Sequence, residues 1–520
     1  MTTIKTLLLS SLVVALLPSA GVYAAPPDDT LVVGFSADAS TFDPAQISSR
    51  DNSNIARHMF RTLYEGLPDG DTVPDLAVSY VVSDDGLDYT YTLAEGLTCE
   101  DGEPLTAEDV AYSFNRAADP ANKFTGSTPG YIFSSVDFQS AEAVSELEAK
   151  ISIGRKNPIA FSLLADVLIH CKDSYEALSI EEAVVAPVAS GDYRLVTWDR
   201  GSQIVLEKFR GDAAFDNLVF RIIPEASTRT AELIAGNVDI ITNVGPDQID
   251  AVDSSGNAVV QKVEGTRRIY VGFNLREDFA EASEGGAAIQ KTDVRKALQY
   301  AIDVPAICSQ LLNFDCVRAD GLVNPPNDNQ SLEPYPFDPD MAEELLDAAG
   351  YPRGEDGVRF EINLQGPRGR YLNDAAVIQA IGQYLNDIGV STTVELMEFA
   401  SVYVPLIREK NAGPLFFLGT GGNLSSPLND MTDLSTVEAG TNYTSWANPE
   451  WFDGWAEIAE TTTPEEQRPI IDRMLEVFYN DPPWLMLYFQ PDFYGVSNRI
   501  NWEARRDERV YLWGATLASQ

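Results

Sequence analysis

Two loops of the chain carry residue types that suit the reversible binding of a small polar molecule. Arg370 lies in the loop 366–371 and offers a planar guanidinium fork to a carboxylate or another anion. The loop 419–428 is rich in glycine, which allows backbone groups to approach a ligand closely, and its glycines are Gly419, Gly421 and Gly422. The alternative interpretation is a flexible loop with a structural arginine.

Catalytic chemistry is not indicated by the motifs. The nucleophile motif GxSxG, the zinc motif HExxH and a histidine-centred triad are all missing from the sequence. The two histidines, His58 and His170, have no obvious nucleophile nearby in sequence, and no two of the 79 acidic residues stand out as a glycosidase pair. We therefore expect no catalytic residue and no cofactor, and keep a secreted hydrolase as the second hypothesis.

The four cysteines predict disulfides rather than a metal site. The CxxC spacing of zinc sites is absent, and two histidines offer few ligands for zinc or nickel. An even number of cysteines in an exported chain favours disulfides, and three pairings are possible. The local loop Cys308–Cys316 is the favoured pair, which leaves Cys99 to pair with Cys171 within one predicted domain.

The first 24 residues have the pattern of a secretory signal peptide. One charge, Lys5, precedes the apolar run 7–17 and a break at Pro18, and the small-residue cleavage rule is met at Ala24. The run is too short for a membrane anchor, and no cysteine near the cleavage site would accept a lipid. The sequence therefore predicts an exported, soluble protein in a Gram-negative periplasm.

The chain is strongly acidic, with 36 basic and 79 acidic residues and a formal net charge of −43. This charge argues against nucleic acid and anionic membrane surfaces as partners. It has two interpretations: a solvated surface suited to a salty environment, or electrostatic steering of a cationic solute. At 520 residues the chain exceeds what a single hydrophobic core usually supports, so two or three domains are expected.

The stretch 190–244 predicts a compact unit that would position one candidate side chain. The β-rich runs 193–198 and 203–209 flank a glycine-containing loop, which indicates a hairpin, and 218–223 indicates a buried strand. A helix capped by Ser227 or Thr228 and stopped by Gly236 leads to a further strand, 238–242. Such a βαβ crossover places ligand-binding loops beyond the carboxyl ends of its strands, where Asn243 and Gly245 lie.

A second region of alternating elements would position the two loops described above. Strands are predicted at 359–364, 392–397 and 415–418, with helices between them and a loop at 365–374. That alternation predicts a mainly parallel sheet. The loops that follow its strands gather at one edge, so 366–371 and 419–428 are expected to border a cleft.

Three segments resemble a known family. The runs YRLVTWDRGSQIVLEKF (193–209) and FRIIPEASTRTAELIAGNVDII (220–241), with the region 73–120, are similar to segments of the peptide/opine/nickel family of ABC-transporter solute-binding proteins. The resemblance implies the α/β, two-lobed periplasmic-binding-protein fold, class II, of the large three-subdomain type. It implies lobe I at 28–65, 183–273 and 490–520, a peripheral subdomain at 66–182, and lobe II at 274–489, with a hinge and an interlobe ligand cleft.

The resemblance also implies candidate ligand contacts. Residues just after an Asp-Pro turn line the cleft in peptide-binding relatives, and a second loop carries an Asp that here is replaced by Ser425-Ser426-Pro427-Leu428. The first crossing between lobes is expected at 273–275 and the return crossing near 488–490. With the geometric candidates, the predicted contacts are Ser48, Ser49, Arg50, Asn243, Phe273, Asn274, Arg370, Tyr371, Thr420, Gly421, Gly422, Ser425, Ser426, Trp446, Tyr488 and Gln490.

The function implied is that of the periplasmic binding component of an ABC importer. Such a protein would capture a small-molecule or peptide ligand between its lobes, act as a monomer and deliver the ligand to the permease subunits. The missing Asp leaves opines, sugars and small cationic osmolytes open beside peptides. A sensor or other binding protein with the same fold but no transport role is a third hypothesis.

Overall fold

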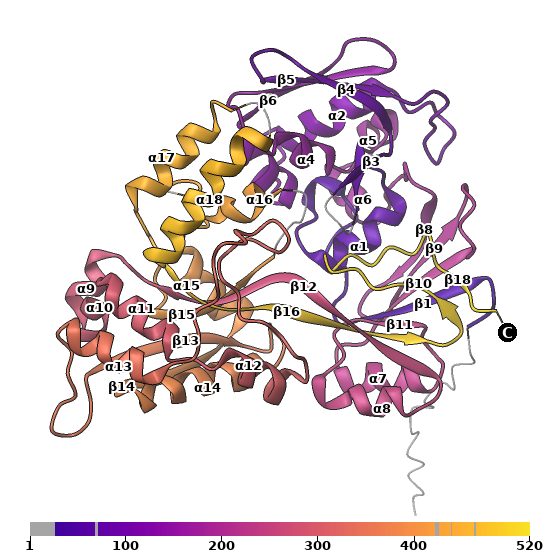
Figure 1. Ribbon diagram of the computed structural model, residues 1–520. Coiled ribbons are helices and arrows are strands. Elements are labelled where there is room, and N and C mark those ends of the chain that lie inside the picture. Colours follow the sequence, from indigo (N-terminus) through magenta and orange to yellow (C-terminus); the bar gives the residue numbers. More distant parts are fainter. Residues whose placement is uncertain (1–25, 68–70, 422–425, 438, 462–463, 520) are drawn as a thin grey trace, which may run out of the picture.

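The computed structural model describes residues 26–67, 71–421, 426–437, 439–461 and 464–519, so the predicted signal peptide lies outside the described residues. A ten-stranded sheet runs through the molecule in the order β14-β13-β15-β12-β16-β11-β1-β10-β9-β8 (Figure 1). Its strands are β1 (Thr30–Phe35), β8 (Tyr193–Asp199), β9 (Gln203–Lys208), β10 (Asn217–Ile222), β11 (Ile240–Ile241), β12 (Ala258–Phe273), β13 (Phe360–Arg368), β14 (Val390–Glu398), β15 (Leu415–Thr420) and β16 (Trp484–Ser497).

Helices lie on both sides of this sheet (Figure 1). The longer ones are α1 (Arg50–Met59), α2 (Ala107–Ala118), α7 (Ala226–Ile234), α11 (Thr292–Tyr300), α13 (Pro339–Ala348), α14 (Asp374–Asp387), α17 (Pro449–Ile458) and α18 (Pro464–Asn480). The shorter ones are α3 (Ser134–Val136), α4 (Ala160–Ala165), α5 (Lys172–Glu176), α6 (Ile180–Val185), α8 (Ile249–Asp253), α9 (Glu277–Ala282), α10 (Glu284–Ala288), α12 (Val304–Ile307), α15 (Val404–Arg408) and α16 (Pro427–Met431). None of the described helices is both long enough and apolar enough to span a bilayer.

The predicted unit at 190–244 is confirmed. Strands β8 and β9 form the antiparallel hairpin, and β10 and β11 both pair with β1 in parallel. Helix α7 makes the crossover, and Gly236 follows it with a φ of 75°, a left-handed conformation that glycine adopts without strain. The predicted caps are wrong, because Glu225 is the N-cap of α7 and its side chain makes no capping hydrogen bond.

The second half of the sheet is parallel as predicted, since β13 pairs in parallel with both β14 and β15. The loop expected at 365–374 is shorter than predicted. Strand β13 continues to Arg368, and its residues Gly366 and Pro367 pair with Leu396 and Met397 of β14. The described loop between β13 and α14 therefore begins at Gly369. Helices α11 and α14 pack against this half of the sheet in one apolar core.

Two long antiparallel strands, β12 and β16, join the two halves of the sheet (Figure 1). The first half of β12 pairs with 491–497 and its second half with 484–489, with register shifts between Glu264 and Arg268 and again between Ile269 and Tyr270. At the first shift the backbones come together: a Cβ added to Gly265 would lie 2.4 Å from the carbonyl oxygen of Gln490. Only glycine fits such an approach, so the ribbon has a defined irregular step at this point.

A separate four-stranded antiparallel sheet lies above the main sheet in Figure 1 and forms the third part of the fold. Its strands are β4 (Ala77–Val82), β5 (Asp88–Leu93), β7 (Glu148–Ile153) and β6 (Phe138–Ala143), in that order. Helix α2 opens with a capping box formed by Thr106 and Asp109. The buried side chains of this part share one apolar core with residues of α17 and α18.

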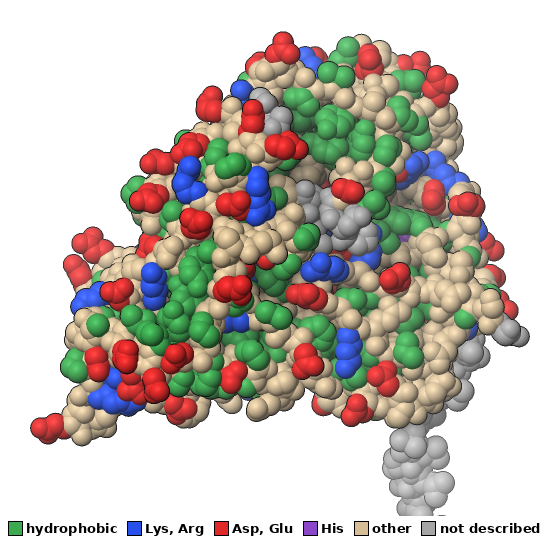
Figure 2. Space-filling model, in the orientation of Figure 1, with side chains coloured by type: hydrophobic (Ala, Val, Ile, Leu, Met, Phe, Trp, Pro, Cys, Tyr) green, Lys and Arg blue, Asp and Glu red, His purple; other side chains and the backbone are tan. Residues whose placement is uncertain are grey.

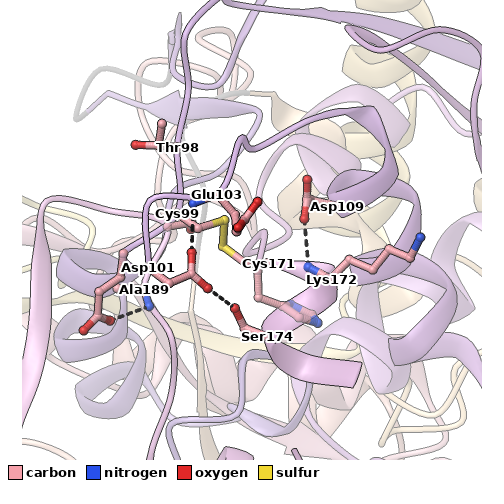
Figure 3. Close-up of a disulfide and its surroundings, with 12 residues drawn as sticks. Thr98, Cys99, Asp101, Glu103, Asp109, Cys171, Lys172, Ser174 and Ala189 are labelled. Atoms are coloured by element: carbon pink, nitrogen blue, oxygen red, sulfur yellow. Dashed lines mark hydrogen bonds between the residues drawn. A yellow bond between two sulfur atoms is a disulfide. The ribbon is translucent and has the colours of Figure 1, made fainter. Parts of the chain in front are cut away.

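Both predicted disulfides are present in the structure. Cys99 pairs with Cys171, which joins the loop after β5 to the start of α5, and Cys308 pairs with Cys316. Figure 3 shows polar contacts around the first bridge, including the hydrogen bond from Ser174 to Asp101 and that from the Lys172 amide to Asp109. The bridge therefore lies in a hydrogen-bonded corner of the peripheral sheet.

Candidate functional site

A cavity of about 1680 Å³ lies where the first and second halves of the sheet and the peripheral part meet. Its wall combines the start of α1, the loops after β11 and β13, the end of β15, the middle of β16 and the C-terminal segment 507–509. This volume exceeds the usual range of small-molecule pockets, about 300–1,000 Å³, so the cavity has room for a ligand of several residues or for a smaller ligand with water.

Nine of the predicted contact residues line this cavity. They come from five segments that are distant in sequence, which the sheet brings together at one edge. These residues are Ser48, Ser49, Arg50, Asn243, Arg370, Tyr371, Thr420, Gly421 and Gln490. Gly422 and Ser425 lie outside the described residues.

The other five predicted contacts that the structure describes lie outside the cavity wall. Phe273 and Tyr488 are packed in the apolar core of the second half, and Asn274 is buried with its amide donating to the carbonyls of Lys410 and Ala412. The buried Trp446 donates its indole N–H to Asp481. Ser426 caps α16 by accepting a hydrogen bond from the Leu428 amide and is not part of the cavity wall.

The Arg50 side chain reaches the cavity because of the way α1 begins. Ser49 is the N-cap, and its hydroxyl accepts a hydrogen bond from the Asn52 amide, so Arg50 is the first helical residue and stays exposed. The Arg50 guanidinium makes no hydrogen bond or ion pair with any described residue. Burial of the site and the neighbouring Arg509 lower its pKa. Arg50, on the side of the first half of the sheet, is therefore a cation that has no ion-pair or hydrogen-bond partner among the described residues. We call such a side chain an uncommitted cation.

Arg370 faces the cavity from the second half. Asp374 fixes its loop by accepting hydrogen bonds from the amides of Gly369, Arg370 and Tyr371, at 3.0, 2.8 and 3.1 Å. The guanidinium lies over the rings of Tyr371 and Phe399, with centroid distances of 5.3 and 5.4 Å. Such stacking orients a guanidinium and leaves its N–H groups free. No described residue accepts a hydrogen bond from it, so Arg370 is a second uncommitted cation.

Glu508 connects these two cations electrostatically. Burial opposes its ionisation, but Arg267, Arg50 and Arg370 together lower the pKa of its carboxyl. Arg267 holds it by two hydrogen bonds of 2.9 and 2.7 Å. Arg50 and Arg370 therefore both act on one carboxyl of the cavity wall that they line.

The cavity wall has balanced charge, unlike the chain as a whole. Among the described residues of the wall, the seven cations are all arginines: Arg50, Arg57, Arg229, Arg267, Arg268, Arg370 and Arg509. Its seven acids are Asp51, Asp166, Asp247, Asp433, Asp492, Asp507 and Glu508. Figure 2 shows the other acidic side chains scattered over the visible face of the molecule. The excess of acidic residues thus lies outside the described cavity wall, which agrees with the solvated-surface interpretation.

Several wall arginines are already paired with wall acids. Arg57 and Arg509 both contact Asp166, and Arg268 contacts Asp433 at 3.0 Å and the neighbouring Asp430 at 2.8 Å. These ion pairs are partly or fully buried, so they fix the shape of the wall. They leave the binding of a solute to the side chains without such partners.

Backbone strain also gathers at the cavity. Four non-glycine residues of its wall have φ in the left-handed region: Asn243 at 56°, Asn313 at 51°, Asn373 at 49° and Glu508 at 59°. Asparagine tolerates this conformation, whereas a glutamate in it costs about 1–3 kcal/mol. Strained residues of this kind concentrate at ligand sites, where the surrounding structure holds them in place.

Sequence reasoning missed the acidic members of this site. Asp51 directly follows Arg50 but was not singled out. Glu508 and Arg509 belong to the charged run 503–509 near the C-terminus. The high density of charged residues in this run was the signal that could have indicated the site, because charged side chains are rarely buried unless they are paired.

Comparison with known proteins agrees with this architecture. The family model described as bacterial extracellular solute-binding proteins, family 5 middle, matches residues 71–442. The chain belongs to this family. Among curated proteins of similar sequence, the glutathione-binding protein GsiB of Shigella flexneri is 26% identical over 478 residues, covering 88% of each chain.

Solved structures of similar fold include bacterial binding proteins. The ABC-transporter substrate-binding protein CtaP of Listeria monocytogenes has a TM-score of 0.80 and 21% identity, covering 94% of this chain and 99% of its own. The periplasmic binding protein DppA of Helicobacter pylori, in complex with a peptide, has a TM-score of 0.76 and 22% identity, covering 94% of this chain and 98% of its own. The predicted two-lobed α/β fold is confirmed.

Proposed function

We propose that the protein is the solute-binding component of an ABC importer, which captures a small polar, peptide-like solute in this cavity and presents it to the membrane permease. One observation carries the proposal. The uncommitted cations Arg50 and Arg370 belong to the proposed lobes I (28–65, 183–273 and 490–520) and II (274–489), and they face the same cavity. A solute that contacts both would hold the two lobes together.

Closure of the two lobes over a solute needs a hinge, and we propose that it lies at the irregular step of the β12–β16 ribbon. The pairing is interrupted after Glu264, and Gly265 faces Gln490 on the opposite strand. The earlier candidate, 273–275, is less suited, because Phe273 pairs with Leu415 of β15 and its amide donates to Pro483. A break in hydrogen bonding lets a ribbon bend with the least cost, so 264–268 is the more favourable pivot, and the proposed boundary of lobe I on β12 moves from 273 to this step.

Binding of the solute shifts the population of the protein from the open to the closed form, and no covalent bond is made or broken. A solute that contacts both lobes stabilises the closed form by its differential contacts, and the permease recognises that form. The relatives support a peptide-like solute, because one similar protein is named for glutathione and another was solved with a peptide. The family consists of extracellular solute-binding proteins, and we place this member in the periplasm as a monomer that returns its ligand unaltered.

Closure is the first testable outcome. A panel of dipeptides, glutathione, opines and sugars is screened by thermal shift, since a binding solute raises the melting temperature. Small-angle X-ray scattering with the best binder is expected to show a smaller radius of gyration than without it. Mass spectrometry is expected to recover the binder with its mass unchanged. A radius of gyration that does not change with the binder would contradict the proposal. Recovery of a chemically altered compound would also contradict it and would favour the secreted hydrolase.

Removal of Arg370 is the second test. Arg370→Ala is expected to weaken a carboxylate-bearing binder by ~1.5–3 kcal/mol, the range for a hydrogen bond to a charged group. Isothermal titration calorimetry would then report about a tenfold to hundredfold higher Kd. Arg368→Ala is the matched control, because Arg368 is exposed two residues earlier and is not part of the cavity wall. Equal affinities of wild type and Arg370→Ala would remove Arg370 from the site.

A further inference from the structure

One hydrogen bond joins the irregular step of the β12–β16 ribbon to a loop of the cavity wall. The loop 369–373 connects β13 to α14, and all five of its residues line the cavity. The Leu372 amide donates to the side-chain oxygen Oε1 of Gln490 on β16, at 3.0 Å. Gln490 is also the residue whose carbonyl approaches Gly265 at the first register shift. The loop is therefore held by the residue that marks the proposed pivot.

The other hydrogen bonds of the described loop hold it to its own half of the sheet. Asp374, at the start of α14, accepts from the first three amides of the loop. The side-chain bonds run from the Tyr371 hydroxyl to the Gly419 carbonyl at 3.1 Å and from the Asn373 amide group to the Leu311 carbonyl at 2.9 Å. These partners all belong to the proposed lobe II. The bond from the Leu372 amide is thus the one that leads to the ribbon.

The side chain of Leu372 lies at the same boundary. It is half-buried and packs against the apolar cores of both halves of the sheet. The core of the first half contributes residues such as Val244 and Phe493, and that of the second half contributes Ile378 and Tyr488. Leu372 is therefore attached to both lobes. A rotation of one lobe on the other has to change these contacts or to carry the loop with it.

Movement of Leu372 is transmitted to Arg370, two residues earlier in the same loop. Peptide bonds are planar, so this short segment has few soft dihedral angles to absorb the movement. The Arg370 guanidinium lies over the rings of Tyr371 and Phe399, and the first of these rings belongs to the loop. A bend of the ribbon and the direction of the Arg370 guanidinium are therefore linked through Gln490.

We propose that Gln490 is a positioning residue, which transmits the bend of the ribbon to the loop 369–373 and so sets the place of Arg370 in the closed form. This inference rests on the proposed function and adds a residue that acts through the loop. The sequence placed Gln490 among the ligand contacts, because it lies at the return crossing. In the structure its side-chain oxygen already accepts a hydrogen bond from Leu372, so its contribution to affinity is indirect.

A double-mutant cycle tests this contribution. Gln490→Met keeps the length of the side chain and removes the acceptor. The tightest binder of the panel of dipeptides, glutathione, opines and sugars is titrated by calorimetry into wild type, Gln490→Met, Arg370→Ala and the double variant. Gln490→Met is expected to raise Kd about threefold to tenfold, as for one lost hydrogen bond. In the Arg370→Ala background it is expected to change Kd by less than about twofold, because the loop no longer carries the guanidinium.

Gln261→Met is the matched control. Gln261 lies on β12 of the same ribbon, where it donates to the Trp502 carbonyl at 2.8 Å and accepts from the Ala504 amide at 2.7 Å. It is not part of the described cavity wall, and both of its partners belong to lobe I. Gln261→Met therefore removes hydrogen bonds from the ribbon without touching the loop, and its Kd is expected to equal that of wild type. Circular dichroism verifies that both variants fold.

Hydrogen exchange followed by mass spectrometry gives a readout that needs no substitution. In wild type, addition of the binder is expected to slow exchange in 369–373 and in 264–268 together, because the bond through Gln490 connects the two segments. In Gln490→Met the loop is expected to exchange faster than in wild type even without a solute, and in Gln261→Met it is expected to exchange at the wild-type rate.

The outcomes separate this inference from the proposed function. Equal Kd values for wild type and Gln490→Met, or effects of Gln490→Met and Arg370→Ala that add, overturn the positioning role and leave solute capture standing. Protection of the loop by the binder without protection at 264–268 also overturns it. A protein that binds no member of the panel and retains no solute on purification overturns the proposed function, and the inference with it.

Discussion

Replacing Arg268 by methionine is expected to lower the free energy of unfolding by about 3–5 kcal/mol, the cost of breaking a buried ion pair. The Arg268 side chain is 1% exposed and contacts Asp430, also 1% exposed, and Asp433. Its guanidinium further donates to the Leu322 carbonyl and the Thr420 hydroxyl. Methionine fills much of the same volume but leaves two carboxylates in the interior without a cation, so the loss comes from uncompensated charge.

Urea denaturation followed by circular dichroism measures this loss. The matched control is Arg473→Met, because Arg473 pairs with Glu457 at 2.6 Å but both side chains are 51% exposed. An exposed pair of this kind contributes roughly 0–1 kcal/mol. Adding Asp430→Asn and Asp433→Asn to Arg268→Met should restore much of the stability, because the buried charges are then gone. Similar losses in Arg268→Met and Arg473→Met would show that the buried cluster has no special role.

Removing the Cys99–Cys171 disulfide is expected to have a comparable effect. The bridge joins cysteines 72 residues apart, and both are almost fully buried. A cross-link over a loop of this length restricts the unfolded chain by about 4 kcal/mol in the chain-entropy model. Cys99→Ala with Cys171→Ala should therefore unfold at clearly lower urea concentration than wild type. The change should be concentrated in the peripheral sheet and seen as faster hydrogen exchange in β5 and β7.

The second disulfide supplies the control for this prediction. Cys308 and Cys316 are only 8 residues apart, so the same model gives about 2.5 kcal/mol for their bridge. Cys308→Ala with Cys316→Ala should thus be the less damaging pair, and it should leave exchange in the peripheral sheet unchanged. The reverse order of stabilities would refute the assignment of the larger role to Cys99 and Cys171.

Local patterns in the sequence predicted several elements of the main sheet. The β-rich runs 193–198 and 203–209 flank a glycine-containing loop, and strands β8 and β9 occupy these positions. The end of β13 could not be found this way. Gly366 and Pro367 are ordinary loop residues in isolation, and they become strand residues because β14 pairs with them. Such pairing depends on partners about 30 residues away, which periodicity does not contain.

The sequence predicted the site residues whose position depends on the order of the strands. It failed for residues whose position depends on side-chain packing. Arg370, Asn243 and Gly421 follow strands at the binding edge, so topology alone placed them. Phe273 and Tyr488 also lie on the crossing strands, but their side chains turn into the core of the second half. The position along a strand gives no information on which face a side chain occupies once both faces are covered.

The arginines of the cavity wall have a practical consequence for work with this protein. A guanidinium does not react with the amine-directed reagents that attach dyes to lysine, and the described wall carries all of its positive charge on arginine. A fluorophore coupled to surface lysines would therefore leave the cations that face the solute chemically intact. The protein can in this way be converted into an optical reporter of its own ligand without altering a side chain on the described cavity wall.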